Sequence, residues 1–228
     1  MSLSKKINSR IKQKVKKGSK SVSSRRWLER QLNDPYVKAA KSEGYRSRAA
    51  YKLIEIDSKY KIFKNKVSVL DLGGAPGGWS QVASNKIISS KKKIIVTIDI
   101  HPIEPLEEVF CIQGNILDDK TLEIIKNKFP YKTDVVISDM SPSSSGHKNT
   151  DQTRSLLLAE IALDVAINLL NINGNFCCKL IRGRGEEELV TTMRQYFKEI
   201  KRYKPKSSRK ESAEIFIIGL NFMHQGLA

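Results

Sequence analysis

The sequence predicts an α/β protein built on a parallel, doubly wound sheet. Short runs rich in β-branched residues alternate along the chain with segments of helical length and pattern. A glycine-rich stretch directly follows the first apolar run, and acidic residues stand at the ends of later runs. Strands of this composition, separated by helices, are typical of parallel sheets that are covered on both faces.

The predicted elements follow one another in a regular order. Two helical segments come first, at residues 23–44 and 47–60, and Ser47 is the predicted N-cap of the second. The predicted strands are residues 67–72, 93–100, 108–114, 133–142 (ending in a proline-containing loop), 175–181 and 213–222. The predicted later helices are residues 78–87, 118–129, 150–170, which closes on a turn at 171–174, and 186–197.

The charge divides the chain into a basic arm and one domain. Residues 1–24 contain eight Lys and Arg side chains and no acid, so this segment carries +8 of the formal net charge of +17. Because it has few apolar residues, we expect a disordered arm, which serves either as a solubilising tail or as a contact to phosphates. Residues 25–228 form the predicted domain and still carry +9, which favours a polyanionic partner.

The cysteines and the apolar runs indicate the cellular setting. Cys111, Cys177 and Cys178 lie inside apolar runs without metal-ligand spacing, which predicts reduced thiols in a cytoplasmic protein and no metal site. No apolar run approaches the length of a membrane span, and the pattern of a secretory signal is missing. We therefore expect no membrane partner, and we expect a monomer.

The stretch VLDLGGAPGGWSQVAS, residues 69–84, predicts a ligand site after the first strand. Its glycine spacing does not match the dinucleotide fingerprint, because Ala75 stands where that pattern needs glycine. It does not match a P-loop either, because Trp79 stands where the phosphate-binding lysine belongs. Four glycines exceed the needs of a turn, so we expect the bare backbone around Gly73, Gly77 and Gly78 to lie against a ligand, with Trp79 as a wall.

Polar residues at later strand ends point to the nature of that ligand. Asp99 ends the second predicted strand and could accept hydrogen bonds from two ribose hydroxyls. Asn115 follows the third strand, where it could meet an adenine edge, and Asp139 follows the fourth. Any one of these residues could be a helix N-cap, but the set suits S-adenosylmethionine, an adenosine with a cationic amino-acid tail.

The chain resembles the RrmJ/FtsJ family of ribose 2′-O-methyltransferases, of the bacterial type that modifies large-subunit ribosomal RNA. The resemblance rests on SRAAYKLIEI, VLDLGGAPGGWSQVAS, ISDMSP, CKLIRG and SSRKESAEIFIIG, and it runs from near Ser23 almost to the C-terminus. It implies a Rossmann-like methyltransferase sheet of seven mostly parallel strands with the last antiparallel. It further implies S-adenosylmethionine as donor and a uridine ribose in the large ribosomal subunit as acceptor.

The same resemblance implies the site residues. The family's Lys-Asp-Lys-Glu tetrad falls on Lys52, Asp139, Lys179 and Glu214, with Glu211 as the alternative glutamate. For the donor it implies Gly77, Trp79 and Asp99. Asn115 departs from the family's aspartate, and Gly74 replaces the family's usual alanine, a change that we expect the turn to tolerate. We expect Asn115 to weaken donor binding without abolishing it.

Basic clusters beside these positions predict a track for RNA phosphates. The track residues are Arg46, Arg48, Arg182, Arg184, Lys204, Lys206, Arg209 and Lys210. Residues 141–154 lack periodicity and are predicted to form a mobile lid, in which His147 is a loop residue and not a base. The alternatives are a transfer-RNA ribose methyltransferase, a non-catalytic RNA-binding assembly factor and a nucleotide-dependent oxidoreductase, which the glycine spacing disfavours.

Overall fold

The computed structural model describes residue 14 and residues 22–87, 93–129 and 132–223, so the predicted arm lies almost wholly outside the described residues. The helices are α1 (Val22–Asn33), α2 (Pro35–Ser42), α3 (Ala50–Tyr60), α4 (Gly78–Lys86), α5 (Asp119–Lys128), α6 (Lys148–Leu169) and α7 (Glu186–Arg194). The strands are β1 (Ser68–Leu72), β2 (Ile94–Asp99), β3 (Phe110–Gln113), β4 (Thr133–Ser138), β5 (Leu170–Ile181), β6 (Phe197–Tyr203) and β7 (Glu214–Phe222).

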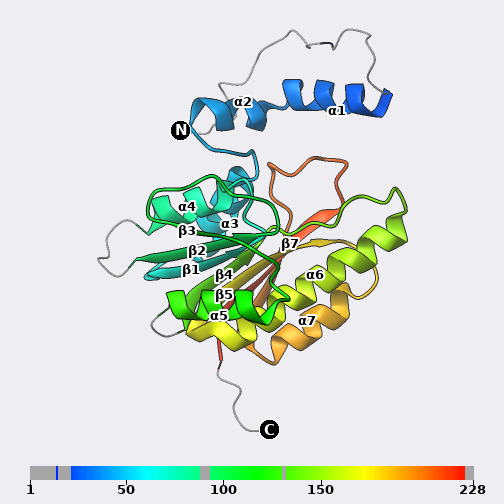
Figure 1. Cartoon of the computed structure of the whole chain (residues 1–228). Helices are drawn as coiled ribbons and strands as arrows, with labels where there is room; N and C mark the ends of the chain where they lie inside the picture. Colours follow the sequence, from blue (N-terminus) through cyan, green and yellow to red (C-terminus); the bar gives the residue numbers. More distant parts are fainter. Residues whose placement is uncertain (1–13, 15–21, 88–92, 130–131, 224–228) are drawn as a thin grey trace.

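The strands form one seven-stranded sheet in the order β3-β2-β1-β4-β5-β7-β6 (Figure 1). The pairs among β1, β2, β3, β4 and β5 are parallel, whereas β7 is antiparallel to both β5 and β6. The predicted α/β fold with a mostly parallel sheet and an antiparallel last strand is therefore confirmed.

Helices cover both faces of this sheet. Helices α3 and α4 lie on one face (Figure 1). They pack against the strands through Leu53, Ile56 and Val82. On the other face, α5, α6 and α7 bury Ile125, Leu163 and other side chains against the opposite side of the same strands. Each interior strand is therefore apolar on both sides, which is why the strand runs in the sequence are continuous and not alternating.

The strand β6 was missed by the sequence prediction, which continued a helix to residue 197 and placed no strand between that helix and residue 213. Its sequence is FKEIKRY, and only Phe197 is fully buried. The reason is its position at the edge of the sheet, where most side chains reach solvent and charged residues are tolerated. A prediction based on hydrophobicity therefore could not recognise this mostly charged segment as a strand.

The predicted helix over residues 23–44 is two helices, and the break falls at Asp34 and Pro35. Pro35 occupies the first position of α2, where its missing N–H costs nothing, and Asp34 caps the helix by accepting from the Tyr36 N–H at 3.0 Å. The predicted N-cap at Ser47 is wrong, since α3 begins at Ala50 and has no side-chain cap.

The region around residues 170–174 also differs from the prediction. Helix α6 begins at Lys148, so the second half of the predicted lid is helical, and β5 starts directly at Leu170. The pairing of β4 with β5 shifts register between Thr133 and Val135, and the predicted turn residues are absorbed there as an irregularity, with Asn173 at a positive φ of 63°.

No helix among the described residues has the length and apolar character that crossing a membrane requires.

Gly74 packs closely against β2, and the structure has no room for a side chain at this position. A Cβ atom at residue 74 would lie 1.8 Å from Oγ1 of Thr97, a fully buried residue of β2. We predict that Gly74→Ala destabilises the protein by about 1–3 kcal/mol, as overpacking does, measured by urea unfolding. The double variant Gly74→Ala, Thr97→Ala removes the blocking oxygen and should recover part of the lost stability. If Gly74→Ala alone were as stable as the wild type, β2 would have to shift to make room for the Cβ atom, and the prediction would be wrong.

Candidate active site

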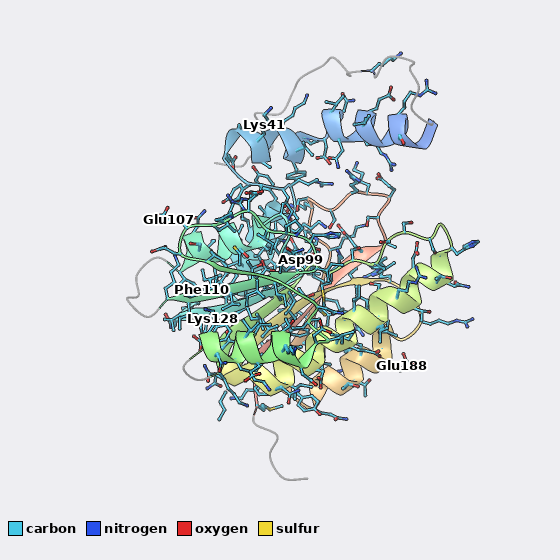
Figure 2. The ribbon with its side chains drawn as sticks, in the orientation of Figure 1. Lys41, Asp99, Glu107, Phe110, Lys128 and Glu188 are labelled. Carbon is cyan, nitrogen blue, oxygen red and sulfur yellow. The ribbon has the colours of Figure 1, made fainter. Side chains whose placement is uncertain are left out.

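The carboxyl ends of β1, β2 and β4 meet at one edge of the sheet, where loops carry Gly73, Asp99 and Asp139. Figure 2 shows Asp99 near the middle of the molecule, close to the point where the strands end. This edge is where ligands bind in open α/β sheets. The predicted site residues are thus brought to the expected place.

The four tetrad residues form a continuous chain of alternating charge. Nζ of Lys52 donates to Oε2 of Glu214 at 2.9 Å and lies 4.0 Å from Oδ1 of Asp139. Nζ of Lys179 lies 3.0 Å from the same Oδ1 and donates to the Asp139 carbonyl oxygen at 2.6 Å. Both lysines are buried, at 9% and 8% exposure, which is rare for this residue type unless it is paired.

Strand alternation explains why these side chains share one face. In β5, Cys177 belongs to the core under α3 and α4, whereas Cys178 belongs to the core under α6. Lys179 therefore returns to the α3/α4 side. Its register partner is Phe216 of β7, above whose ring Nζ of Lys52 lies at 5.6 Å. The glycine-rich loop leads into α4 on this same side of the sheet.

The structure also distinguishes the two candidate glutamates. Glu214 begins β7, two residues before Phe216, so its side chain falls on the same face and reaches Lys52. Glu211 is exposed and lies in the preceding loop, at the rim of an adjacent pocket. The geometry favours Glu214 as the fourth member.

Contacts with the protein account for all four glycines of the loop. Gly73 and Gly77 have positive φ values of 74° and 112°, which favour glycine. A Cβ atom would lie 2.5 Å from Met140 at Gly73, 2.8 Å from Leu106 at Gly77 and 2.4 Å from the Ser47 hydroxyl at Gly78. The number of glycines is therefore explained by close packing within the protein, and it no longer argues for a ligand. Donor binding by Gly73, Gly77 and Gly78 stays a prediction.

Trp79 does not line an open pocket through its ring. The ring is 3% exposed, packs against Phe216 with ring centroids 5.6 Å apart, and donates its Nε1–H to the Ala49 carbonyl at 2.9 Å. The expectation that Trp79 forms a ligand wall is therefore corrected for the side chain. The ring anchors α4 to the start of α3, and only the main chain of Trp79 remains a predicted donor contact.

Asp99 and Asn115 carry polar oxygens at the site edge. The Asp99 carboxylate accepts from the Ala75 N–H at 3.0 Å and from the His101 N–H at 2.8 Å. Asn115 is exposed, and its Oδ1 accepts from the Leu117 N–H at 3.1 Å. Each of these oxygens has a second lone pair, so the backbone contacts orient the groups and leave acceptor capacity for a ligand.

Two apolar residues beside them were missed by the sequence analysis. Ile100 is 62% exposed directly after Asp99, and Leu117 is 63% exposed two residues after Asn115. Large apolar side chains in loops at the end of buried strands are a signal that sequence could have offered. They give the edge an apolar surface next to its polar oxygens, which is the usual composition of a small-molecule site.

Arg46, predicted to face RNA, instead clamps two loops of the site. Its guanidinium donates to the carbonyl of Pro76 at 3.1 Å in the glycine loop, and to the carbonyls of Glu104 at 2.6 Å and Pro105 at 2.7 Å in the loop after β2. The expectation that Arg46 belongs to a phosphate track is corrected accordingly. Of the other track residues, Arg182, Arg184, Lys204, Lys206 and Lys210 are exposed.

The loop before α6 is held by Asp151 of its first turn. The Asp151 carboxylate accepts from the N–H and hydroxyl of Ser145 and from the hydroxyl of Ser144, and these hydrogen bonds lower the pKa of Asp151. His147 is exposed at the N-cap position without a side-chain cap bond, in keeping with a loop residue. Among the described residues, no cluster of His, Cys, Asp or Glu could hold a metal ion.

A buried carboxyl lies beneath the glycine loop and was not predicted. Asp71 of β1 is fully buried, and burial raises its pKa to about 7, although the hydroxyl of Ser80, which donates to its Oδ2 at 2.6 Å, opposes the shift. The carboxylates of Asp139 and Asp99 add to the increase. The site edge thus contains a carboxyl group that changes charge near neutral pH.

We predict a pH-dependent gain in stability for Asp71→Asn. Because the folded pKa lies above the value of 3.8 expected for an ordinary aspartate, the folded state binds the proton more tightly, and wild-type stability falls as the pH rises toward about 7. The variant should match the wild type at about pH 3, below both pKa values, and exceed its free energy of unfolding at about pH 8. Denaturant unfolding at the two values measures this; an unchanging difference would place the titration elsewhere.

Comparison with known proteins identifies the family of this site. The profile of the FtsJ-like methyltransferases matches residues 45–222. Ribosomal RNA large subunit methyltransferase E of Rickettsia felis is 47% identical over 205 residues, 89% of this chain and 90% of that protein, and the enzyme of the same name from Ehrlichia chaffeensis is 45% identical over 202 residues, 88% and 94% of the two chains. A crystal structure described as a candidate ribosomal RNA methyltransferase from Plasmodium falciparum superposes with a TM-score of 0.71 at 33% identity, covering 79% of this chain and 100% of that one. This chain therefore belongs to the FtsJ-like methyltransferase family.

Proposed function

We propose that this methyltransferase modifies the ribose 2′-hydroxyl of a uridine in large-subunit ribosomal RNA, with S-adenosylmethionine as donor. The observation that carries the proposal is the chain of Glu214, Lys52, Asp139 and Lys179 at the carboxyl edge of the sheet. The relatives named as ribosomal RNA large subunit methyltransferases support the choice of RNA. All four residues come from one chain, which fits a monomeric enzyme.

The site edge fits the donor in its chemistry. Asp99 offers carboxylate oxygens for ribose hydroxyls, Asn115 offers an amide oxygen for the adenine amino group, and the exposed side chains of Ile100 and Leu117 offer apolar contact for the base. When bound, the sulfonium supplies an activated methyl group. The protein must then align the acceptor oxygen and stabilise the negative charge that develops on it.

Lys179 is the residue placed to act on the acceptor hydroxyl. Its ammonium donates to the Asp139 carbonyl and forms an ion pair with the Asp139 carboxylate, so N–H groups remain for a developing alkoxide. We assign to Lys179 the uptake or stabilisation of the hydroxyl proton, and to Asp139 the orientation of Lys179. Lys52, held by Glu214, is placed to bind the ribose and its phosphate.

We predict that Lys179→Ala lowers the methyl-transfer rate by about 10²–10⁴-fold, the range for a lost acid–base group, and leaves the donor Kd within about twofold. Radiolabelled transfer and isothermal titration calorimetry measure the two quantities, and circular dichroism checks the fold. Lys198→Ala, an exposed lysine of β6, is the matched control. Normal methylation by a folded, donor-binding Lys179→Ala protein would defeat the assignment.

The acceptor is tested by mapping the methylated nucleotide. Wild-type protein is incubated with labelled donor and with large ribosomal subunits, free large-subunit RNA or transfer RNA, and ribose methylation is located by its resistance to alkaline cleavage. We expect a single uridine in the large-subunit RNA. Modification of transfer RNA alone would replace the proposed substrate, and RNA binding without transfer would support an assembly factor.

A separate prediction concerns the Arg46 clamp on the donor side. Arg46→Ala removes three hydrogen bonds that join the glycine loop to the loop after β2, so the donor Kd should rise by about tenfold while RNA affinity changes little. Calorimetry with donor and RNA separates the two effects. Arg194→Ala, on the exposed side of α7, should leave donor binding intact; loss of RNA affinity alone in Arg46→Ala would return Arg46 to the phosphate track.

A further inference from the structure

A basic pocket adjoins the tetrad and is not explained by donor binding. Its cavity of about 390 Å³ is lined by Arg30, Arg48 and Arg209 together with Lys52 and Glu214 of the tetrad. The pocket therefore shares two of its walls with the catalytic residues. Whatever it holds lies within reach of the atoms that carry out the reaction.

The three arginines come from segments that are far apart in the sequence. Arg30 belongs to α1, Arg48 to the turn before α3, and Arg209 to the loop between β6 and β7. In Figure 1 that loop, coloured orange, rises from the sheet toward α1 and α2. The pocket is thus closed by two elements that stand above the sheet, the helix pair and the loop.

Asp34 joins these segments and fixes the arginines. Its Oδ2 lies 2.9 Å from Nη1 of Arg48 and 3.7 Å from Nε of Arg209, while its Oδ1 accepts from the N–H of Tyr36. The Asp34 side chain is 8% exposed. A carboxylate with so little access to water interacts strongly with its partners, so it holds both guanidinium groups in place.

Further contacts hold Arg48 and the loop rigidly. The Arg48 guanidinium lies over the Tyr36 ring at 5.6 Å and donates to the Ser207 carbonyl. The carboxylate of Glu55 on α3 accepts from the N–H groups of Lys206 and Ser207 at 2.7 and 2.8 Å. The pocket is therefore preorganised, which lowers the entropy lost when a ligand binds.

We propose that this pocket binds a backbone phosphate of the acceptor strand, next to the reacting ribose, and that Asp34 is a positioning residue for its arginines. This inference rests on the proposed function. Its support is chemical, because guanidinium groups match the geometry of phosphate oxygens, and because a phosphodiester lies within one nucleotide of every ribose hydroxyl. Four cationic side chains line the cavity against the carboxylates of Glu211 and Glu214, so the lining has an excess of positive charge.

The first test measures RNA binding by full-length variants that lack one pocket arginine, with an arginine elsewhere on α1 as the control. Arg30→Ala and Arg209→Ala should each weaken binding of a 20-nucleotide single-stranded RNA by about five- to tenfold, whereas Arg25→Ala on α1, which does not line the pocket, should not. Each lost phosphate contact should also reduce the slope of log K against log salt by about 0.7. Unchanged affinity and slope in both pocket variants would overturn the proposal.

The second test uses Asp34→Asn, which keeps the size and N-capping ability of the side chain and removes its charge. A positioning role predicts weaker RNA binding, by a factor similar to that of Arg209→Ala, and a double variant that loses less than the product of the two effects. Tighter RNA binding would mean that Asp34 competes with phosphate, which overturns its positioning role.

Donor affinity, measured in parallel, should be unchanged in all of these variants. Failure of the inference can be told apart from failure of the proposed function. If the wild type transfers no methyl group to RNA, the function fails; if it transfers normally while the pocket variants bind RNA like the wild type, only the pocket assignment fails.

Discussion

The site depends on one carboxylate that two buried lysines share. Oδ1 of Asp139 lies 3.0 Å from Nζ of Lys179 and 4.0 Å from Nζ of Lys52. Burying an ammonium group costs several kcal/mol unless a carboxylate compensates it. Glu214 supplies the second carboxylate through Lys52, so the four charges balance as one unit and none of them is independent of the others.

That balance explains why the antiparallel strand matters for chemistry. Because β7 runs against β5, its first residue, Glu214, pairs with Ile181 at the carboxyl end of β5. A parallel strand in the same place would bring its last residue to this edge. The reversal therefore delivers a strand-start glutamate to the edge where Asp139 and Lys179 already lie, and it connects the sheet topology directly to the ionic chain.

The sequence predicted what depends on local pattern, and failed where distant contacts decide. Strand ends placed Asp99 and Asp139 correctly, and resemblance to a family supplied the tetrad. Trp79 looked like a ligand wall, but its partners, Ala49 and Phe216, lie 30 and more residues away along the chain. Arg46 looked like a phosphate contact because its carbonyl partners cannot be read from its neighbours.

Strand β6 shows the same limit for the fold. Its residues alternate poorly between apolar and polar, because an edge strand needs little apolar surface to pair with β7. Its existence is decided by the hydrogen-bonding edge that β7 offers, and that edge exists only after the chain has folded. The hydrophobic pattern of FKEIKRY therefore could not reveal it.

The short turn before α3 links the two halves of the site. Arg46 holds the loops on the donor side, and the Ser47 hydroxyl lies where a side chain on Gly78 would be. Arg48 faces the basic pocket through Asp34, and the Ala49 carbonyl anchors Trp79. Four successive residues of one segment thus contact the glycine loop and α4 through Arg46, Ser47 and Ala49, and the basic pocket through Arg48.

Lys52 lies about one helical turn after Arg48, in α3, and the turn before α3 fixes the position of this helix. A displacement of the turn would move the donor loop, the pocket arginine and the Lys52 ammonium together. Alignment between methyl donor and ribose oxygen is sensitive to shifts of about 1 Å, so a common support for both sides is a physical advantage. If the proposed function holds, the turn supports the donor side and the acceptor side together, while the shared carboxylate of Asp139 holds the two lysines.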